Sequence, residues 1–392
     1  MKRTGVTSRG IITPIFRQGD DLVKGVTESL LAASVEEGFQ FGDGDIVGVT
    51  EAVVARTQGN YATCEEIAQD VKSKLGDDVI GILFPILSRN RFAIMLRAFS
   101  MAAKKLIIQL SYPGDEVGNS FLTADMLDAK GVNPYTDSFN LEEFRTTFGN
   151  DTVHTFTGVD YIEYYRSLGD NIDVVFSNDP RYILSLTKNV INCDIHTRVR
   201  TRRILREAGG NAYSMDEIMT APVGNSGYNP QFGLLGANKA TEDKVKLFPK
   251  DADAFVEKLA ESLFEATGKR IEVMVYGDGG FKDPVGGIWE LADPVISPAY
   301  TDGLEGTPNE LKMKYFADNE FASLSGERLN EAMRRRIREK DKSLKGSMQS
   351  QGTTPRRLTD LLGSLCDLTS GSGDRGTPVV LIQGYFTNFA TE

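Results

Sequence analysis

The chain has 392 residues, 40% of them hydrophobic and 25% charged, which is the composition of a globular protein with room for two or three domains. A formal net charge of −11 argues against a general nucleic-acid or anionic-membrane binder, and no run of apolar residues is long enough to cross a membrane. The three cysteines are widely spaced without a C-x-x-C pair, which gives no zinc signature and favours a reducing compartment. We therefore expect a cytoplasmic protein with no nucleic-acid and no membrane partner.

Strand and helix patterns alternate in the N-terminal part of the chain. Either Asp20 or Asp21 is a plausible N-cap for the first helix, and the glycine-rich turn at 42–45 precedes a buried strand, I-V-G-V-T. The segment V-V-A-R-T-Q-G either continues this strand or starts the next element. The predicted elements are an extended piece at 10–16, helices at 22–36, 64–75 and 91–104, and strands at 46–50 and 105–110. Such alternation favours a mixed α/β fold.

The middle of the chain, residues 111–225, differs from the rest in amino-acid composition. It is rich in Asn, Asp and Tyr, and it contains both histidines, His154 and His196. They have no serine or cysteine motif to pair with, so we interpret them as structural, with a ligand-orienting role as the alternative for His196 in D-I-H-T-R. Because this region has an apolar periodicity of its own, we predict a folded, inserted α/β region. The predicted division is therefore 1–110, 111–225 and 226–392, with the first and last parts forming one domain.

The C-terminal part also mixes helices with strands. An amphipathic helix is predicted at 251–267, followed by a strand that ends at Tyr276 and a basic helix at 320–342. Thr354 is a plausible N-cap, with Pro355 at the first helical position, for a helix that continues to residue 367. The last predicted strand is V-V-L-I-Q-G, at 379–384.

Acidic residues gather after the strand that ends at Tyr276. The strand runs into the turn G-D-G-G at 277–280, and the four acids that follow within a short span are Asp278, Asp283, Glu290 and Asp293. Carboxylates in a glycine-rich turn at a strand end are typical ligands of a hard cation such as Mg²⁺. The alternative is that glycine and aspartate simply form a turn.

The sequence contains no Walker-type P-loop, but it has two candidate anion sites. The pattern G-x-G-x-x-G occurs once, at Gly371, Gly373 and Gly376, after a predicted helix and before a strand, which is the wrong order for a dinucleotide fold. This loop is either a backbone nest for phosphate or an ordinary surface loop. The segment S-R-N-R at 88–91 begins a predicted helix and suits an anion, although a capped helix with two solvated arginines explains it better.

Several stretches follow one another along the chain in a characteristic order. The first three are T-P-I-F-R-Q-G-D-D-L at 13–22, D-G-D-I-V-G-V at 43–49, and T-E-A-V-V-A-R-T-Q-G at 50–59. They continue with G-A-N-K-A-T-E before L-F-P-K-D-A-D at 247–253, V-M-V-Y-G-D-G, and the last helix, loop and strand at 361–384. In this order the stretches resemble the coenzyme F420-0:L-glutamate ligase (F420 γ-glutamyl ligase-like) family. We interpret the chain as a divergent member with a large insertion, similar to the family over about 8–60, 225–300 and 354–386.

The resemblance implies a mixed α/β ligase, usually a homodimer, that uses a nucleoside triphosphate and a divalent metal to join an amino acid to a small-molecule carboxylate. GTP or ATP would be the co-substrate and Mg²⁺ or Mn²⁺ the metal. The nucleotide-binding residues that it implies are Thr13, Pro14, Ile15, Phe16, Glu51, Arg56, Glu242, Ser370, Gly371, Ser372 and Gly373. It also implies Asp278 as a metal ligand. The other acidic ligand of the family is missing here, unless Glu242, Asp283 or Glu290 replaces it.

Several positions depart from the family pattern. A family serine corresponds to Glu51 and a family lysine to Arg56, while a metal-binding aspartate corresponds to Lys239 or, with a shift of one residue, to Asn238. We expect Arg56 and Lys239 to act as catalytic cations, with Lys239 against the phosphates, in an enzyme that needs fewer metals. The alternative is a ligand- or nucleotide-binding protein that kept the fold and lost ligation.

Overall fold

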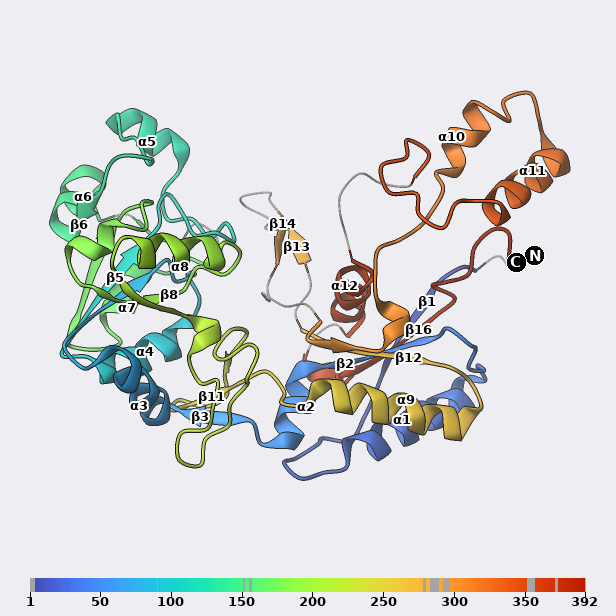
Figure 1. Ribbon diagram of the computed structural model, residues 1–392, viewed down its shortest axis with the longest axis horizontal. Helices are drawn as coiled ribbons and strands as arrows, with labels where there is room; N and C mark the ends of the chain where they lie inside the picture. The colour runs from blue at the N-terminus through green and yellow to red at the C-terminus, as the bar shows by residue number, and fades with distance from the viewer. Residues whose placement is uncertain are drawn as a thin grey trace.

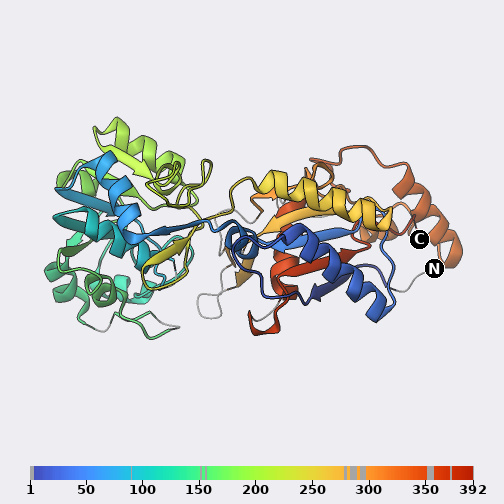
Figure 2. The ribbon, with the colours of Figure 1, turned by 90° about the horizontal axis from the view of Figure 1, so that it is seen from below.

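The computed structural model describes residues 4–89, 91–150, 152–154, 157–277, 280–282, 289–291, 297–350, 357–370 and 373–391, with only the backbone described at 280–282 and 289–291. Two lobes lie side by side, and the two chain ends lie together at the outer end of one of them (Figures 1 and 2). The fold is mixed α/β, as predicted from the alternation of strands and helices. Within the described residues, no helix is long and apolar enough to cross a membrane.

The lobe with the chain ends is built on a five-stranded sheet. Its strands, in spatial order, are β1 (Thr7–Ile11), β16 (Val379–Gln383), β2 (Ile46–Thr50), β12 (Glu272–Tyr276) and β15 (Ala299–Tyr300). β2 is parallel to β12, while β16 is antiparallel to both β1 and β2. Consequently β1, β2 and β12 run in the same direction, and their carboxyl ends meet at one edge of the sheet.

Helices cover both faces of this sheet, which gives three layers (Figure 1). On one face, α1 (Leu22–Glu37) and α9 (Ala252–Thr267) bury leucine, valine and phenylalanine side chains against the valines of β2 and β12. On the other face, α12 (Leu358–Ser370) packs Leu362 and Cys366 against the opposite sides of the same strands. Strands buried on both faces are expected to be almost continuously apolar, as V-V-L-I in β16 is.

The second lobe is a doubly wound sheet of six strands. Its strands, in spatial order, are β6 (Phe139–Asn140), β7 (Ile172–Phe176), β5 (Lys105–Leu110), β4 (Val79–Leu83), β8 (Asn189–Asn192) and β9 (Asn211–Ser214). All are parallel except β6. The core on one face takes side chains from α3 (Cys64–Leu75), α4 (Phe92–Ala102), α6 (Leu141–Phe148) and α7 (Tyr161–Arg166). The core on the other face includes Leu205 of α8 (Arg198–Glu207). A short helix, α5 (Ala124–Lys130), precedes α6.

Smaller elements complete the described structure. A three-stranded sheet of β10 (Asn238–Lys239), β11 (Lys244–Lys246) and β3 (Tyr61–Thr63) lies between the lobes, close to α2 (Glu51–Gln58) (Figure 1). β13 (Gly280–Lys282) pairs with β14 (Trp289–Leu291). Near the chain ends, α10 (Met313–Asp318) and α11 (Gly326–Arg338) form a small apolar cluster with Phe389.

Most of the predicted elements are present, and the differences have local causes. The segment V-V-A-R-T-Q belongs to α2, which ends where Gly59 adopts a left-handed conformation that glycine tolerates best. The helix predicted at 320–342 is shorter in the structure: α11 begins after Ser325, its N-cap residue, and ends at Arg338. The predicted helix start at Thr354 and Pro355 lies outside the described residues. The predicted boundary between residues 110 and 111 falls within the doubly wound sheet, since β4 and β5 pair there with β8 and β7.

Candidate functional site

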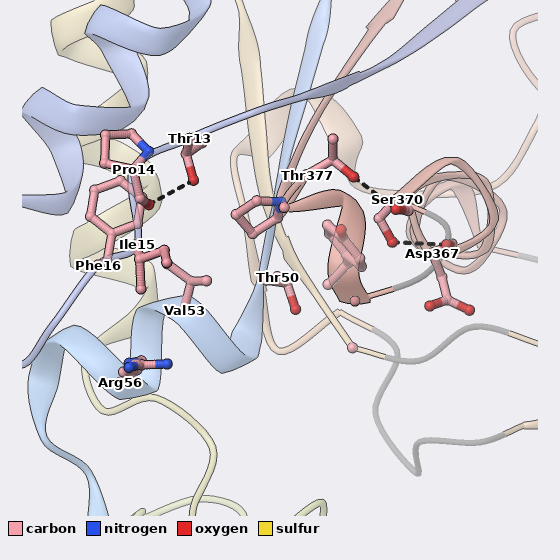
Figure 3. A pocket seen from close by; sticks show the side chains of 15 residues that line it. Thr13, Pro14, Ile15, Phe16, Thr50, Val53, Arg56, Asp367, Ser370 and Thr377 are labelled. Carbon is pink, nitrogen blue, oxygen red and sulfur yellow. Dashed lines mark hydrogen bonds between the residues drawn. The ribbon is translucent and has the colours of Figure 1, made fainter.

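A cavity of about 380 Å³ lies where the carboxyl ends of β1, β2 and β12 meet. Ligands commonly bind at the carboxyl ends of parallel strands, because loops that leave neighbouring strands there diverge. The cavity is lined by Thr13, Pro14, Ile15, Phe16, Thr50, Val53, Arg56, Tyr276, Gly277, Asp367, Ser370, Gly373, Gly376, Thr377 and Pro378. Figure 3 shows the turn at 13–16 on one side and Asp367 with Ser370 on the other. Four segments that are distant in sequence therefore surround one space, which we call the main cavity.

Helix α2 begins at the main cavity and supplies the cation of its described lining, Arg56, from the last turn of the helix. Thr50 ends β2 and stands at the N-cap of α2, so Val53 and Arg56 follow at intervals of three residues and lie on the same face of the helix. The hydroxyl of Thr50 makes no capping hydrogen bond, and the Arg56 side chain is exposed. The amide groups of a helix N-terminus and a nearby guanidinium both attract anions.

Backbone pairing holds the turn at 13–16 against the last loop. The amide of Thr13 donates to the carbonyl of Gly376 at 3.2 Å, and the amide of Thr50 donates to the carbonyl of Pro378 at 2.9 Å. Within the loop, the hydroxyl of Thr377 donates to the carbonyl of Ser370 at 2.7 Å. The cavity wall is thus fixed by the registers that pair β16 with β1 and with β2.

A family model for F420-0:gamma-glutamyl ligase matches residues 10–384 of this sequence. The chain belongs to the F420-0:gamma-glutamyl ligase family. This finding confirms the family predicted from the motifs, and the match spans nearly the whole chain, including the predicted insertion at 111–225. A search of curated proteins gave no match.

In this member of the F420-0:gamma-glutamyl ligase family, the structure brings many of the predicted nucleotide-site residues to the main cavity. Those that line it are Thr13, Pro14, Ile15, Phe16, Arg56, Ser370 and Gly373. Gly371 and Ser372 lie outside the described residues. Glu51, Lys239 and Glu242 are not among the described residues that line this cavity.

Lys239 and Glu242 form an ion pair of their own. The ammonium Nζ of Lys239 lies 2.6 Å from Oε1 of Glu242, whose side chain is 85% exposed. The two residues belong to the β10–β11 hairpin, where Lys239 pairs in register with Val245. In this arrangement the charge of Lys239 is balanced by a surface carboxylate, and its contact with phosphate stays a prediction.

Glu51 forms an ion pair with a lysine of the three-stranded sheet. Its carboxylate contacts the ammonium of Lys246 in β11, and both side chains are buried, with exposed fractions of 5% and 11%. Glu51 is the first residue of α2, where the helix dipole favours a negative charge. The pair therefore fastens the start of α2, and with it the wall of the main cavity, to the three-stranded sheet.

The predicted metal ligands are only partly within the described structure. Asp278 and Asp283 lie outside the described residues, and for Glu290 only the backbone, in β14, is described. Among the described residues, no group of three His, Cys, Asp or Glu side chains could hold a metal ion. Asp367 is the only carboxylate in the described lining of the main cavity. The three cysteines are buried free thiols, and burial raises the pKa of Cys366 far above its ordinary value.

Some residues of the main cavity were not predicted from the sequence. Thr50, Val53, Tyr276, Asp367 and Thr377 line it because β2, β12 and β16 are adjacent and in register, with Thr50 opposite Tyr276. The helical spacing from Thr50 to Arg56 could have indicated the first two residues if the segment had been predicted as a helix.

Proposed function

We propose that this chain is a nucleotide- and metal-dependent ligase of the γ-glutamyl type, which forms an amide between an amino acid and a small-molecule carboxylate. The main cavity would bind the nucleoside triphosphate, GTP or ATP. The observation that supports this proposal is the convergence of the 13–16 turn, the first turns of α2 with Arg56, and the last loop on a single cavity in a ligase-family chain.

The proposed chemistry explains why such a cavity is needed. A carboxylate is a poor electrophile, so the γ-phosphoryl group of the nucleotide is transferred to it and gives an acyl phosphate and a nucleoside diphosphate. The amino group then attacks the acyl carbon, the amide bond forms, and inorganic phosphate leaves. The protein contributes mainly by positioning the reactants and balancing their charge.

In this proposal the described residues have distinct tasks. The amide groups at the start of α2 and the guanidinium of Arg56 bind phosphate oxygens and balance their negative charge. The turn at 13–16, with the exposed apolar side chain of Ile15, and the last loop enclose the nucleotide between them.

We propose that Mg²⁺ or Mn²⁺ is bound by Asp278, which follows the cavity residue Gly277 in the sequence, together with Asp283 or Glu290. A divalent cation would neutralise the phosphates and polarise the transferred group. The described residues alone contain no group of side chains that could hold the metal ion. The roles proposed for α2, Arg56 and the two loops are therefore argued without the metal.

The direct test is to incubate the protein with GTP or ATP, Mg²⁺ or Mn²⁺, L-glutamate and candidate acceptors such as F420-0 or a folate, and to measure phosphate release and the mass of the product. Arg56→Ala should weaken nucleotide binding about 10- to 100-fold, as expected for the loss of a charge-assisted hydrogen bond of about 1.5–3 kcal/mol. Arg17→Ala is the matched control, since Arg17 is exposed and is not among the described lining residues. Equal nucleotide affinity of both variants and the wild type would place the nucleotide elsewhere.

The second candidate is a binding protein that kept the fold and lost ligation. The ion pair of Lys239 with an exposed glutamate favours it, because Glu242 already balances the charge of that lysine. Nucleotide binding without phosphate release for any acceptor would support this candidate. Phosphate release that depends on acceptor and amino acid together would exclude it.

A further inference from the structure

A second cavity, of about 640 Å³, lies at the opposite edge of the five-stranded sheet from the main cavity. It is formed where β1 and β2 begin and β16 ends, at the outer end of the lobe where the chain ends lie (Figures 1 and 2). Its lining consists of Thr4, Gly5, Thr7, Arg9, Gln40, Gly42, Asp43, Gly44, Asp45, Gln383, Gly384, Phe386, Thr387 and Thr391. We call it the outer cavity. Its volume falls within the range of about 300–1,000 Å³ that is typical of small-molecule sites.

Asp45 provides a buried carboxylate at this cavity. The residue is 4% exposed, and its Oδ2 accepts hydrogen bonds from the amide of Gly42 at 2.8 Å and from Nε2 of Gln383 at 2.6 Å. Its Oδ1 accepts no hydrogen bond from a residue in the described part of the chain. Oδ1 is not among the fully enclosed unpaired atoms of the described residues, so it stays accessible from the outer cavity, where the ammonium of a ligand can donate a charge-assisted hydrogen bond to it.

Arg9 provides a cation that is already held in place. Its Nε donates to Glu37 at 3.0 Å and its Nη1 donates to Oε1 of Gln383 at 2.9 Å, while the guanidinium stacks on the ring of Phe39 at 4.7 Å. A guanidinium carries five N–H groups, and these contacts use two of them. The remaining N–H groups are suited to a carboxylate, and little conformational entropy is lost because the side chain is already ordered.

Gln383 keeps these two charges apart. Its side-chain oxygen accepts from Arg9 and its side-chain nitrogen donates to Asp45, so the amide stands between the cation and the anion. Among the described residues, Arg9 forms its ion pair with Glu37 and none with Asp45. A cation and an anion separated by one amide complement a molecule that carries the opposite charges at a similar separation.

We propose that the outer cavity binds a zwitterionic ligand, a free amino acid or a short peptide, whose ammonium donates to Oδ1 of Asp45 and whose carboxylate accepts from Arg9. Asp43 also lines the cavity, but its carboxylate lies 3.9 Å from the ammonium of Lys269 and accepts from the amide of Arg270, so its charge is already balanced. Phe386, which is 42% exposed, offers an apolar surface for the rest of the molecule. This site is separate from the proposed nucleotide site and does not depend on ligase activity.

The test uses glycylglycine as a probe with wild-type protein, together with N-acetyl-glycylglycine, which lacks the ammonium, and glycylglycinamide, which lacks the carboxylate. Titration calorimetry or ligand-observed NMR should show saturable binding of glycylglycine and at least tenfold weaker binding of each blocked peptide. Absence of saturable binding, or equal binding of the N-acetylated peptide, would overturn the proposal.

Protein variants locate the site. Asp45→Asn keeps the shape of the side chain but removes its charge, and it should weaken glycylglycine binding at least tenfold, whereas Asp43→Asn in the same turn should change it less than threefold. Arg9→Gln should weaken glycylglycine but leave glycylglycinamide unaffected, which tests the site even if Asp45→Asn fails to fold. Arg56→Ala should leave glycylglycine binding unchanged, so failure of the nucleotide proposal is distinguishable from failure of this one. Equal loss in Asp43→Asn and Asp45→Asn, or loss in Arg56→Ala, would refute the assignment.

Discussion

Substitution of Lys246 by methionine should destabilise the protein through Glu51. Methionine keeps most of the apolar stem of the lysine, so the main change is the loss of the ammonium that faces the buried Glu51 carboxylate. Removal of one partner from a buried ion pair costs about 3–5 kcal/mol, because the other charge stays buried. The N-terminus of α2 compensates for up to about 1 kcal/mol, since Glu51 is its first residue. We therefore expect a loss of about 2–4 kcal/mol in the free energy of unfolding.

The assay is equilibrium unfolding in urea, followed by circular dichroism at neutral pH. Lys244→Met is the matched control, because Lys244 lies in the same strand and its side chain is exposed, and it should change stability by less than about 0.5 kcal/mol. The double variant Glu51→Gln/Lys246→Met should recover at least about 1 kcal/mol relative to Lys246→Met alone, since the uncompensated charge is gone. If Lys246→Met has the same free energy of unfolding as Lys244→Met, the ion pair of Glu51 and Lys246 does not stabilise the contact between α2 and β11. The same conclusion follows if the effects of Glu51→Gln and Lys246→Met are additive.

Three further substitutions test the packing and the electrostatics. Gly25→Ala would place a methyl group 2.5 Å from the Phe16 ring, which lines the main cavity, so we expect about 1–3 kcal/mol of destabilisation in urea and weaker nucleotide binding by calorimetry. Gly48→Ala would force a methyl group against the Cys366 sulfur within the core, with a similar loss of stability but an intact outer cavity, measured by urea unfolding and peptide titration. Burial raises the pKa of Asp115 from 3.8 to about 6, so the folded state holds this proton more tightly than the unfolded state. Wild-type stability should therefore fall relative to Asp115→Asn by roughly 3 kcal/mol as the pH rises from about 4 to 6, and parallel pH profiles would contradict this.

The local elements could largely be predicted from the sequence, because helix caps and apolar periodicity are local signals. The strand I-V-G-V-T of β2 and the helix of α3 are present where the patterns placed them. β4, V-I-G-I-L, was not predicted, and its central Gly81 is explained only by the tertiary structure, where an added Cβ would meet Ile183. The residue preferences of E-A-V-V-A-R-T-Q could not decide between strand and helix, because its two adjacent valines favour a strand. In the structure the segment is the short helix α2, directly after β2.

The cavity depends on pairings that no local pattern contains. The 13–16 turn and the last loop meet because β1 pairs with β16 across the whole length of the chain, from Thr7 opposite Gln383 to Ile11 opposite Val379. From the sequence, the contact between the 13–16 turn and the last loop could be predicted only through the family resemblance. For the same reason, Lys246 could not be predicted as the partner of Glu51, 195 positions away.

Both ends of α2 are fastened to the connection between the lobes. Lys246 holds the first residue of α2, and at the other end the Gln58 side chain donates to the carbonyl of Lys250 and accepts from its amide at 2.7 Å. Asn60, which lies just after α2 and is fully buried, donates to the carbonyls of Tyr228 and Phe248. Since α2 carries Arg56 to the main cavity, any shift of the three-stranded sheet relative to the central sheet must move α2 or break these contacts. The second lobe is thus mechanically linked to the cation of the proposed nucleotide site, although β4 to β9 contribute no residue to the described lining of that cavity.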